Sequence, residues 1–264
     1  MTAQELLKQA KPEEALERMQ ADIKKQPGDA GLRLGLFQLF VLTGQWTRAL
    51  AQVQTAVSLD PALAPLAQML RSLVELEQVR SAVFDGGRVP MVLGPTPDWL
   101  KLLLEICSST NDLRSAQLAK THAKALKNAP ARAGFVDGQA FNWITDADAR
   151  FGPALEVYLQ GNYYWVPFDR VTRIDFEKPR DLQDLIWLRA KLTWSNGGTV
   201  SVHIPVRYPN TEKSICPNLL LARTVAWQEL GTNCLIGTGV RVLSADSGDF
   251  PITTIRTLEF TTKE

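Results

Sequence analysis

Apolar positions in the first half of the chain recur with the spacing of amphipathic helices. Two stretches, KPEEALERMQADIKKQPGDA and QWTRALAQVQTAVSLDPALA, align so that Ala15 matches Ala49 and Pro27 matches Pro61, both at an offset of 34 residues. This period, with a small residue in the second helix and a closing proline, is the signature of the tetratricopeptide repeat. The small residue lets two helices approach closely, and the proline opens the following helix.

A third, degenerate unit follows in LAPLAQMLRSLVELEQVRSAVF, where the helical spacing continues until Gly86, Gly87 and Pro90. A fourth helical pair comes next, with Asp98 and Asp112 as predicted N-caps. The sequence therefore predicts a short helical-repeat array over residues 3–130. Such arrays bury apolar faces between neighbouring repeats and present a groove to partners.

The pattern changes near Pro130–Gly134 to the alternation typical of strands. Apolar residues occupy alternate positions in ALEVYL, and Gly161–Asn162 is predicted to form a two-residue hairpin turn. Two further hairpins are predicted to turn at Asn196–Gly198 and at Gly248–Asp249. Consecutive hairpins with few helical patterns favour an antiparallel sheet that curls into a barrel or sandwich.

These patterns predict an α+β protein with two domains. A tetratricopeptide-like helical domain over residues 1–130 precedes an antiparallel β-rich domain, barrel- or sandwich-like, over residues 131–264. We expect no strand before Pro130 and no long helix after Ala140, because the apolar period changes between these positions.

Charge and composition exclude several classes of partner. The 29 basic and 28 acidic residues give a net charge of +1, which predicts no electrostatic footprint for nucleic acid or an anionic membrane. It also predicts that partner binding depends weakly on salt. The first residues contain no long apolar run, and no stretch of about 18 apolar residues occurs, so neither a signal peptide nor a membrane span is expected.

The three cysteines, Cys107, Cys216 and Cys234, are odd in number and far apart, which favours buried or inert thiols in a reducing cytosol over a disulfide framework. Only two histidines occur, His122 in a predicted helix and His203 in a predicted strand, without a second histidine at metal-binding spacing. No glycine-rich phosphate loop and no nucleophile elbow is present. We therefore expect no cofactor and no metal.

Asp146 and Asp148 are the best candidates for catalysis, because two carboxylates on one face of a strand can bind a metal ion or transfer protons. The alternative is structural: Arg150 pairs with one carboxylate, and turn or capping hydrogen bonds satisfy the other. The structural interpretation is favoured, since no histidine, cysteine or glycine-rich partner lies at useful spacing.

Adjacent aromatic residues, Tyr163, Tyr164 and Trp165, are the best candidates for recognition. In a strand, Tyr163 and Trp165 point to one face and Tyr164 to the other. One face belongs to the core; the other faces the inter-domain seam, a partner protein or a small-molecule pocket. Trp143 and Trp187 complete the predicted partner-binding set, because aromatic rings suit interfaces.

The residues from Phe141 to Pro209 resemble the ImpE family, also called SciE- or TagJ-type, of accessory proteins in bacterial type VI secretion. The resemblance rests on W-I-x-D-A-D-x-R-x-G-P, on Y-Y-W-V-P-F, on D-L-x-D-L-I-W and on an N-G-G turn. The helical repeats at the amino terminus also fit this family.

The resemblance implies a cytoplasmic, non-enzymatic adaptor. Its partner would be the small subunit of the contractile sheath, bound through an amphipathic helix near that subunit's amino terminus, and it would act indirectly with the AAA+ ATPase that recycles the sheath. Two alternatives stay open: an enzyme that uses Asp146 and Asp148, with or without a metal, and a chaperone that keeps sheath subunits soluble.

Overall fold

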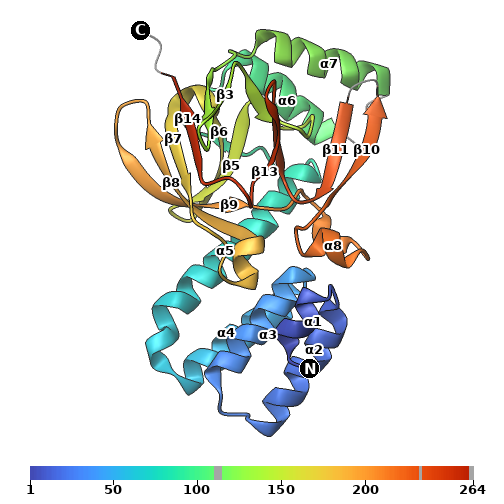
Figure 1. Cartoon of the computed structure of the whole chain (residues 1–264), viewed down its shortest axis with the longest axis vertical. Helices are drawn as coiled ribbons and strands as arrows, with labels where there is room; N and C mark the ends of the chain where they lie inside the picture. The colour runs from blue at the N-terminus through green and yellow to red at the C-terminus, as the bar shows by residue number, and fades with distance from the viewer. Residues whose placement is uncertain (110–114, 232–233, 262–264) are drawn as a thin grey trace.

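A computed structural model of the chain describes residues 1–109, 115–231 and 234–261. Its amino-terminal part is a tetratricopeptide-like set of helices, and a β-rich antiparallel part follows, as predicted (Figure 1). The α-helices are α1 (Ala3–Lys8), α2 (Pro12–Lys25), α3 (Ala30–Leu42), α4 (Trp46–Leu59), α5 (Ala64–Phe84), α6 (Asp98–Ser109), α7 (Ser115–Asn128) and α8 (Pro217–Leu220).

The repeat landmarks fix where the first helices begin, end and pack. The Asp29 side chain caps α3 by accepting a hydrogen bond from the backbone N–H of Leu32 at 3.1 Å. Gly44 follows α3 with φ +67°, a conformation that glycine adopts without strain. Ala15 and Ala49 are both fully buried, so the small residue of each repeat lies where neighbouring helices meet. The 34-residue period is confirmed.

The repeat array ends with α5. In Figure 1, α1–α4 occupy one end of the molecule, α5 runs from them toward the sheet, and α7 lies beside β10 (Val225–Gly231) and β11 (Cys234–Gly239) at the other end. The fourth helical pair therefore packs on the β-rich part instead of extending the array. Asp98 is the first residue of α6 and not its N-cap, and Asp112 lies outside the described residues.

In the part of the chain that the structure describes, the strands form a nine-stranded sheet, a three-stranded sheet and a hairpin. The large sheet has the order β1-β6-β5-β9-β8-β7-β14-β2-β3, the small one β13-β12-β4, and β10 pairs with β11. The strands not yet bounded are β1 (Met91–Val92), β2 (Gly134–Val136), β3 (Gln139–Phe141), β4 (Ile144–Asp146), β5 (Ala154–Leu159), β6 (Asn162–Pro167), β7 (Val171–Phe176), β8 (Trp187–Trp194), β9 (Thr199–Pro205), β12 (Val242–Ala245), β13 (Gly248–Pro251) and β14 (Thr257–Phe260).

The two faces of the large sheet belong to different cores. On β5, Leu155, Val157 and Leu159 point into the core enclosed by the two sheets. Tyr158, on the opposite face of the same strand, belongs to the core formed with the helices. All six residues of β5 are buried, because one face packs on strands and the other on α5 and its neighbours.

Two predicted turns are displaced by one or two residues. The β5–β6 turn consists of Gln160 and Gly161, with φ +49° and +76°, and Asn162 already pairs with Leu159. Gly248 is the first residue of β13 and pairs with Ala245, so the intervening residues form that turn. At both turns the pairing of the flanking strands leaves the residues between them, and not the predicted ones, to form the turn.

The expectation that no strand precedes Pro130 is wrong. Met91 and Val92 form β1, which pairs in parallel with Tyr164 and Trp165 of β6. The segment after α5 returns along the edge of the sheet, and the free backbone groups of β6 bind it there. The division into domains at residues 1–130 and 131–264 stays a prediction. In the described residues, no helix is both long and apolar enough to cross a membrane.

Candidate functional site

A network of buried charged side chains lies between α5 and the β-rich part. Arg80 of α5 donates from Nε to Glu156 Oε1 at 2.7 Å and from its terminal nitrogen to Oε2 at 2.8 Å. The same terminal nitrogen donates to the backbone carbonyl of Arg207 at 2.9 Å. Glu156, on β5, is completely buried, so this two-pronged pair is shielded from water.

The network continues into the sheet through Arg241. Its guanidinium contacts the carboxylates of Asp146 and Glu156, and it lies 4.4 Å from the centre of the Phe151 ring. The Tyr208 hydroxyl donates to Asp146 Oδ1 at 2.8 Å. Asp146 is therefore held by a guanidinium and a phenol that come from distant parts of the sequence.

Asp148 forms a separate pair with Arg150, as the structural interpretation predicted. Arg150 Nε donates to Asp148 Oδ1 at 2.9 Å, and a terminal nitrogen lies 2.5 Å from Oδ2. The backbone N–H of Gly237 donates to the same carboxylate at 2.8 Å. The prediction that both aspartates share a strand face is wrong, because β4 ends at Asp146 and Asp148 lies in the following loop.

Burial and the guanidinium groups shift the pKa values of two carboxyls in opposite directions. Burial raises the pKa of Asp146 to about 6, although Arg241 opposes the shift. Burial also acts on Glu156, but Arg80 and Arg241 outweigh it, so the pKa of Glu156 is lowered. The surroundings therefore favour the charged form of Glu156 and disfavour the charged form of Asp146.

These carboxylates line none of the cavities described below, and each already accepts several hydrogen bonds. Within the described residues, no three histidine, cysteine or carboxylate side chains are arranged to hold a metal ion. His122 lies in α7 and His203 in β9, as predicted. Cys107 and Cys234 are buried, Cys216 is exposed, and all three are free cysteines.

The aromatic residues predicted to bind a partner separate into two groups. Tyr163, Trp165 and Trp187 are buried against the helices, so they form part of the seam and no surface for a partner. Trp165 Nε1 donates to the Tyr163 hydroxyl at 2.6 Å, and that hydroxyl donates to Glu156. Tyr164 is half-buried on the opposite face, and Trp143 is exposed.

Sequence reasoning missed the residues that complete the network: Arg80, Glu156, Tyr208 and Arg241. The sequence did carry a signal for two of these residues, namely a charged side chain at a position where the surrounding pattern is apolar. Glu156 stands between Leu155 and Val157 in a strand that is otherwise apolar, and Arg80 stands on the apolar face of a helix. A charged residue at such a position requires a buried partner.

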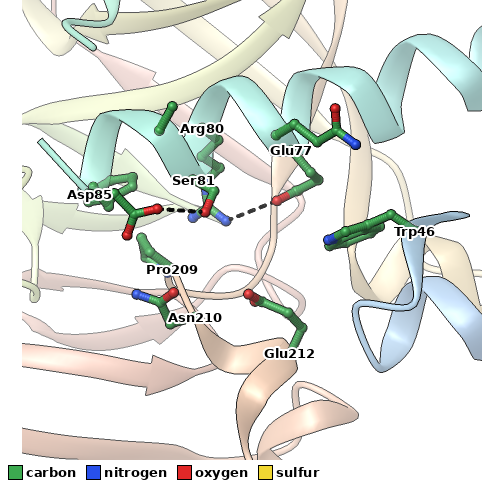
Figure 2. A pocket seen from close by; sticks show the side chains of 11 residues that line it. Trp46, Glu77, Arg80, Ser81, Asp85, Pro209, Asn210 and Glu212 are labelled. Atoms are coloured by element: carbon green, nitrogen blue, oxygen red, sulfur yellow. Dashed lines mark hydrogen bonds and ion pairs between the residues drawn. The ribbon is translucent and has the colours of Figure 1, made fainter. Parts of the chain in front are cut away.

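A polar cavity of about 300 Å³ opens at the seam between α5, the start of α4 and the loop after Tyr208. Figure 2 shows Trp46, Glu77 and Glu212 around it, with Arg80 at its inner wall. Glu77 accepts a hydrogen bond from Trp187 Nε1 at 2.8 Å and lies 3.5 Å from the Arg80 guanidinium. The cavity therefore presents three carboxylates, those of Glu77, Asp85 and Glu212, and the basic residue in its lining, Arg80, is also paired with Glu156.

A larger groove of about 530 Å³ lies between α1, α3 and the β-rich part. Its apolar lining includes Leu7 of α1, Met19 of α2 and Leu39 of α3. Leu182 and Leu185 contribute from the opposite wall, which is a short 3₁₀ helix (Leu182–Leu185). All of these side chains except Leu39 are half-buried, so the groove is an apolar surface open to solvent. We call it the α1–α3 groove.

Comparison with known proteins agrees with this architecture. A family model described as ImpE protein matches residues 138–259, and a tetratricopeptide repeat model matches residues 6–74. The crystal structure of protein VPA1032 from Vibrio parahaemolyticus has the same fold, with a TM-score of 0.89 and 23% identity over 99% of this chain and 98% of that one.

A relative in Pseudomonas aeruginosa is the type VI secretion system accessory component TagJ. It is 34% identical over 260 residues, which are 98% of this chain and 91% of the relative. The two proteins are 34% identical over nearly the whole of both chains, and the ImpE model matches residues 138–259 of this chain. Together these findings establish the family. The chain belongs to the ImpE family.

Proposed function

We propose that the protein is a cytoplasmic, non-enzymatic accessory protein of a type VI secretion system, and that it binds the amino-terminal helix of the small sheath subunit. The accessory role rests on the similarity to TagJ along 98% of the chain. The helix as ligand rests on the resemblance described above. Indirect action with the AAA+ ATPase that recycles the sheath belongs to the same proposal.

The geometrical observation that carries this proposal is the α1–α3 groove. The half-buried Leu7, Met19, Leu182 and Leu185 offer apolar surface to an incoming side chain. Amphipathic helices bind grooves of this kind through apolar residues spaced three and four apart. The groove lies on α1 and α3, the first helices of successive repeats, so the repeats supply the surface directly.

The buried carboxylates support the adaptor over the enzyme. Asp146 and Asp148 are occupied by Arg241, Tyr208 and Arg150, which leaves neither carboxylate free toward a cavity. A substrate would need to displace a buried ion pair in order to reach them, which is energetically costly.

Size-exclusion chromatography with light scattering tests the proposal. The purified protein should form a complex with the intact small sheath subunit, and no complex with a subunit that lacks its amino-terminal helix. A complex that survives deletion of the helix contradicts the proposed mode of binding. The chaperone alternative predicts instead that the protein suppresses aggregation of unassembled subunits at a one-to-one ratio.

A further inference from the structure

A basic stripe runs along the exposed face of α7, at the end of the molecule away from the repeat array (Figure 1). Lys120, Lys124 and Lys127 are four and three residues apart, so they project from the same side of the helix. All three are exposed, and in the described part of the chain none of them forms an ion pair with a carboxylate. The sequence of α7 itself contains no aspartate or glutamate that would neutralise this lysine stripe.

An apolar cavity of about 350 Å³ lies at the carboxyl-terminal end of the same helix. Leu126 of α7 and Trp143, which lies between β3 and β4, border it and are 37% and 43% exposed. Thr145 also lines the cavity, and its hydroxyl is buried without a hydrogen-bond partner among the described residues. Large apolar side chains that meet at one exposed site are typical of an interaction surface.

The lysine stripe and the cavity are continuous, because Leu126 and Lys127 are consecutive residues in the last turn of α7. From Lys120 to Lys127 the stripe is about 10 Å long, at a rise of about 1.5 Å per residue. About three residues of extended chain cover that length. A ligand that covers both parts therefore carries an apolar side chain and, within a few residues of it, several negative charges.

We propose that the lysine stripe and the Trp143 cavity together form a docking surface for a short acidic peptide segment of a partner protein. An aromatic or aliphatic side chain of that segment fills the cavity between Leu126 and Trp143, and its carboxylates lie along the stripe. We call this the α7 surface.

Charge complementarity identifies the occupant. Unpaired lysines beside an apolar cavity match carboxylates beside an apolar side chain, a combination that a peptide supplies within a few residues. The net charge of the whole chain is only +1, which gives no long-range attraction for a nucleic acid or an anionic membrane. A short acidic segment needs only the local contacts with the three lysines.

The α7 surface is separate from the α1–α3 groove, and the inference does not rest on the proposed function. The helices α1 and α3 belong to the repeat array, whereas α7 packs on β10 and β11. An adaptor with both surfaces can hold two different partners at the same time.

A library of random peptides displayed on phage supplies a ligand without assuming its source. Phage that bind the variant Lys120→Glu/Lys124→Glu/Trp143→Ala are removed before each round of selection on the immobilised wild-type protein. Only peptides that use the α7 surface then remain. The enriched peptides should share an aromatic or aliphatic residue next to a cluster of acidic residues.

Isothermal titration calorimetry with a synthetic peptide of the enriched sequence then measures each half of the surface. Lys120→Glu/Lys124→Glu should weaken binding about tenfold through charge reversal, and Trp143→Ala about tenfold through loss of the contact in the cavity. The matched control, Lys24→Glu/Lys25→Glu, reverses two exposed lysines in the last turn of α2 and should change the affinity less than about twofold. Circular dichroism confirms that each variant is folded.

A peptide with reversed charge provides the sharpest check. Replacing its acidic residues by lysine should weaken binding to the wild type and restore binding to Lys120→Glu/Lys124→Glu, because opposite charges again face each other. Restoration of the affinity to within about threefold of the original pair is expected.

Four results would overturn the proposal. The first is enrichment of no peptide, or of peptides without acidic residues. The second is a charge-reversed peptide that binds Lys120→Glu/Lys124→Glu no better than it binds the wild type. The third is self-association, or co-sedimentation with anionic vesicles, that is lost in the same variant, which assigns the surface to a second copy or to a membrane. The fourth is competition between the enriched peptide and the sheath subunit's amino-terminal helix, which removes the separate partner but leaves the proposed function standing.

Discussion

Arg80 and Glu156, which are 76 residues apart, form a two-pronged ion pair with N–O distances of 2.7 and 2.8 Å. The pair joins the last repeat helix to strand β5 of the large sheet, and both side chains are almost completely buried. Arg241 contacts the same carboxylate. A single buried glutamate thus links α5 to two segments of the β-rich part.

We expect Glu156→Gln to destabilise the protein by about 3 kcal/mol, because it leaves two buried guanidinium groups without their shared counter-ion. Urea unfolding followed by circular dichroism measures the loss. The control is Glu14→Gln, which breaks an exposed pair with Lys11 and should cost less than about 1 kcal/mol. Equal effects of the two substitutions would show that the buried network contributes no more than a surface pair.

The pKa of Asp146 predicts a specific dependence of stability on pH. Its folded-state pKa of about 6 lies above the ordinary value of 3.8, so the folded protein binds the proton more tightly than the unfolded chain does. The contribution of Asp146 to stability is therefore largest below about pH 4 and decreases as the pH rises to about 6.

Comparison of the wild type with Asp146→Asn isolates this contribution. The free energy of unfolding of the wild type, relative to the variant, should fall between pH 4 and pH 6 and stay level above pH 7. A difference that rises with pH over the same interval would mean that Arg241 outweighs burial at this site. Glu156 acts in the opposite direction, since its lowered pKa removes stability at lower pH.

Gly237 should tolerate no side chain. A Cβ atom there would lie 2.2 Å from the Tyr208 ring, and the Gly237 N–H donates to Asp148. Gly237→Ala should therefore cost about 3 kcal/mol or more through overpacking beside the network. Gly28→Ala is the control, since a Cβ atom added there would have no neighbouring atom within 4 Å and the change should stay within about 1 kcal/mol. Thermal unfolding that lowers Tm equally in both variants would contradict this account.

The fold class could be predicted because the spacing of apolar residues along a short stretch of sequence distinguishes a helix from a strand. The offset of 34 residues locates the helices of the repeats, and alternation in ALEVYL identifies a strand with two distinct faces. The register of the strands was harder to predict: Leu159 pairs with Asn162, which places the turn at Gln160 and Gly161, one residue before the predicted position. The short strand β1 could not be found, because two residues are too few to show a period.

The predicted site was less accurate than the fold, for a physical reason. Tyr163 and Trp165 suit a partner-binding surface by residue type, but the helices of the same chain bury them. The sequence shows which face of a strand carries aromatic residues, but it does not show which other part of the chain covers that face. The α1–α3 groove was equally hidden, since Leu7, Met19 and Leu182 come together only through folding.

Trp143 provides a second test of where the partner binds. It is exposed and borders an apolar cavity of about 350 Å³ with Leu126 and Pro153, far along the chain from the α1–α3 groove. Our account predicts that Trp143→Ala leaves affinity for the sheath-subunit peptide within twofold. A tenfold loss in a folded variant (about 1.4 kcal/mol) would place the helix at Trp143, in agreement with the aromatic pattern of the sequence.

The affinity should also respond to salt more strongly than a net charge of +1 implies, because Lys8, Arg180 and Arg223 line the α1–α3 groove together with one acidic residue, Asp181. Opposite charges at a partly exposed rim are screened as ionic strength rises, because the Debye length shortens to about 10 Å at 0.1 M. We expect binding of the sheath-subunit peptide to weaken about fivefold between 50 and 300 mM NaCl, and this change to be absent in Lys8→Glu/Arg180→Glu. Salt-independent binding in the wild type would argue for an entirely apolar contact.

Hydrogen–deuterium exchange with and without the sheath subunit's amino-terminal peptide tests the central claim most directly. The account predicts slower exchange in α1, in α3 and in residues 179–185, the three walls of the groove. It predicts unchanged exchange in residues 126–131 and 143–153, which surround Trp143. Protection confined to these latter residues, with α1 and α3 unaffected, would contradict it.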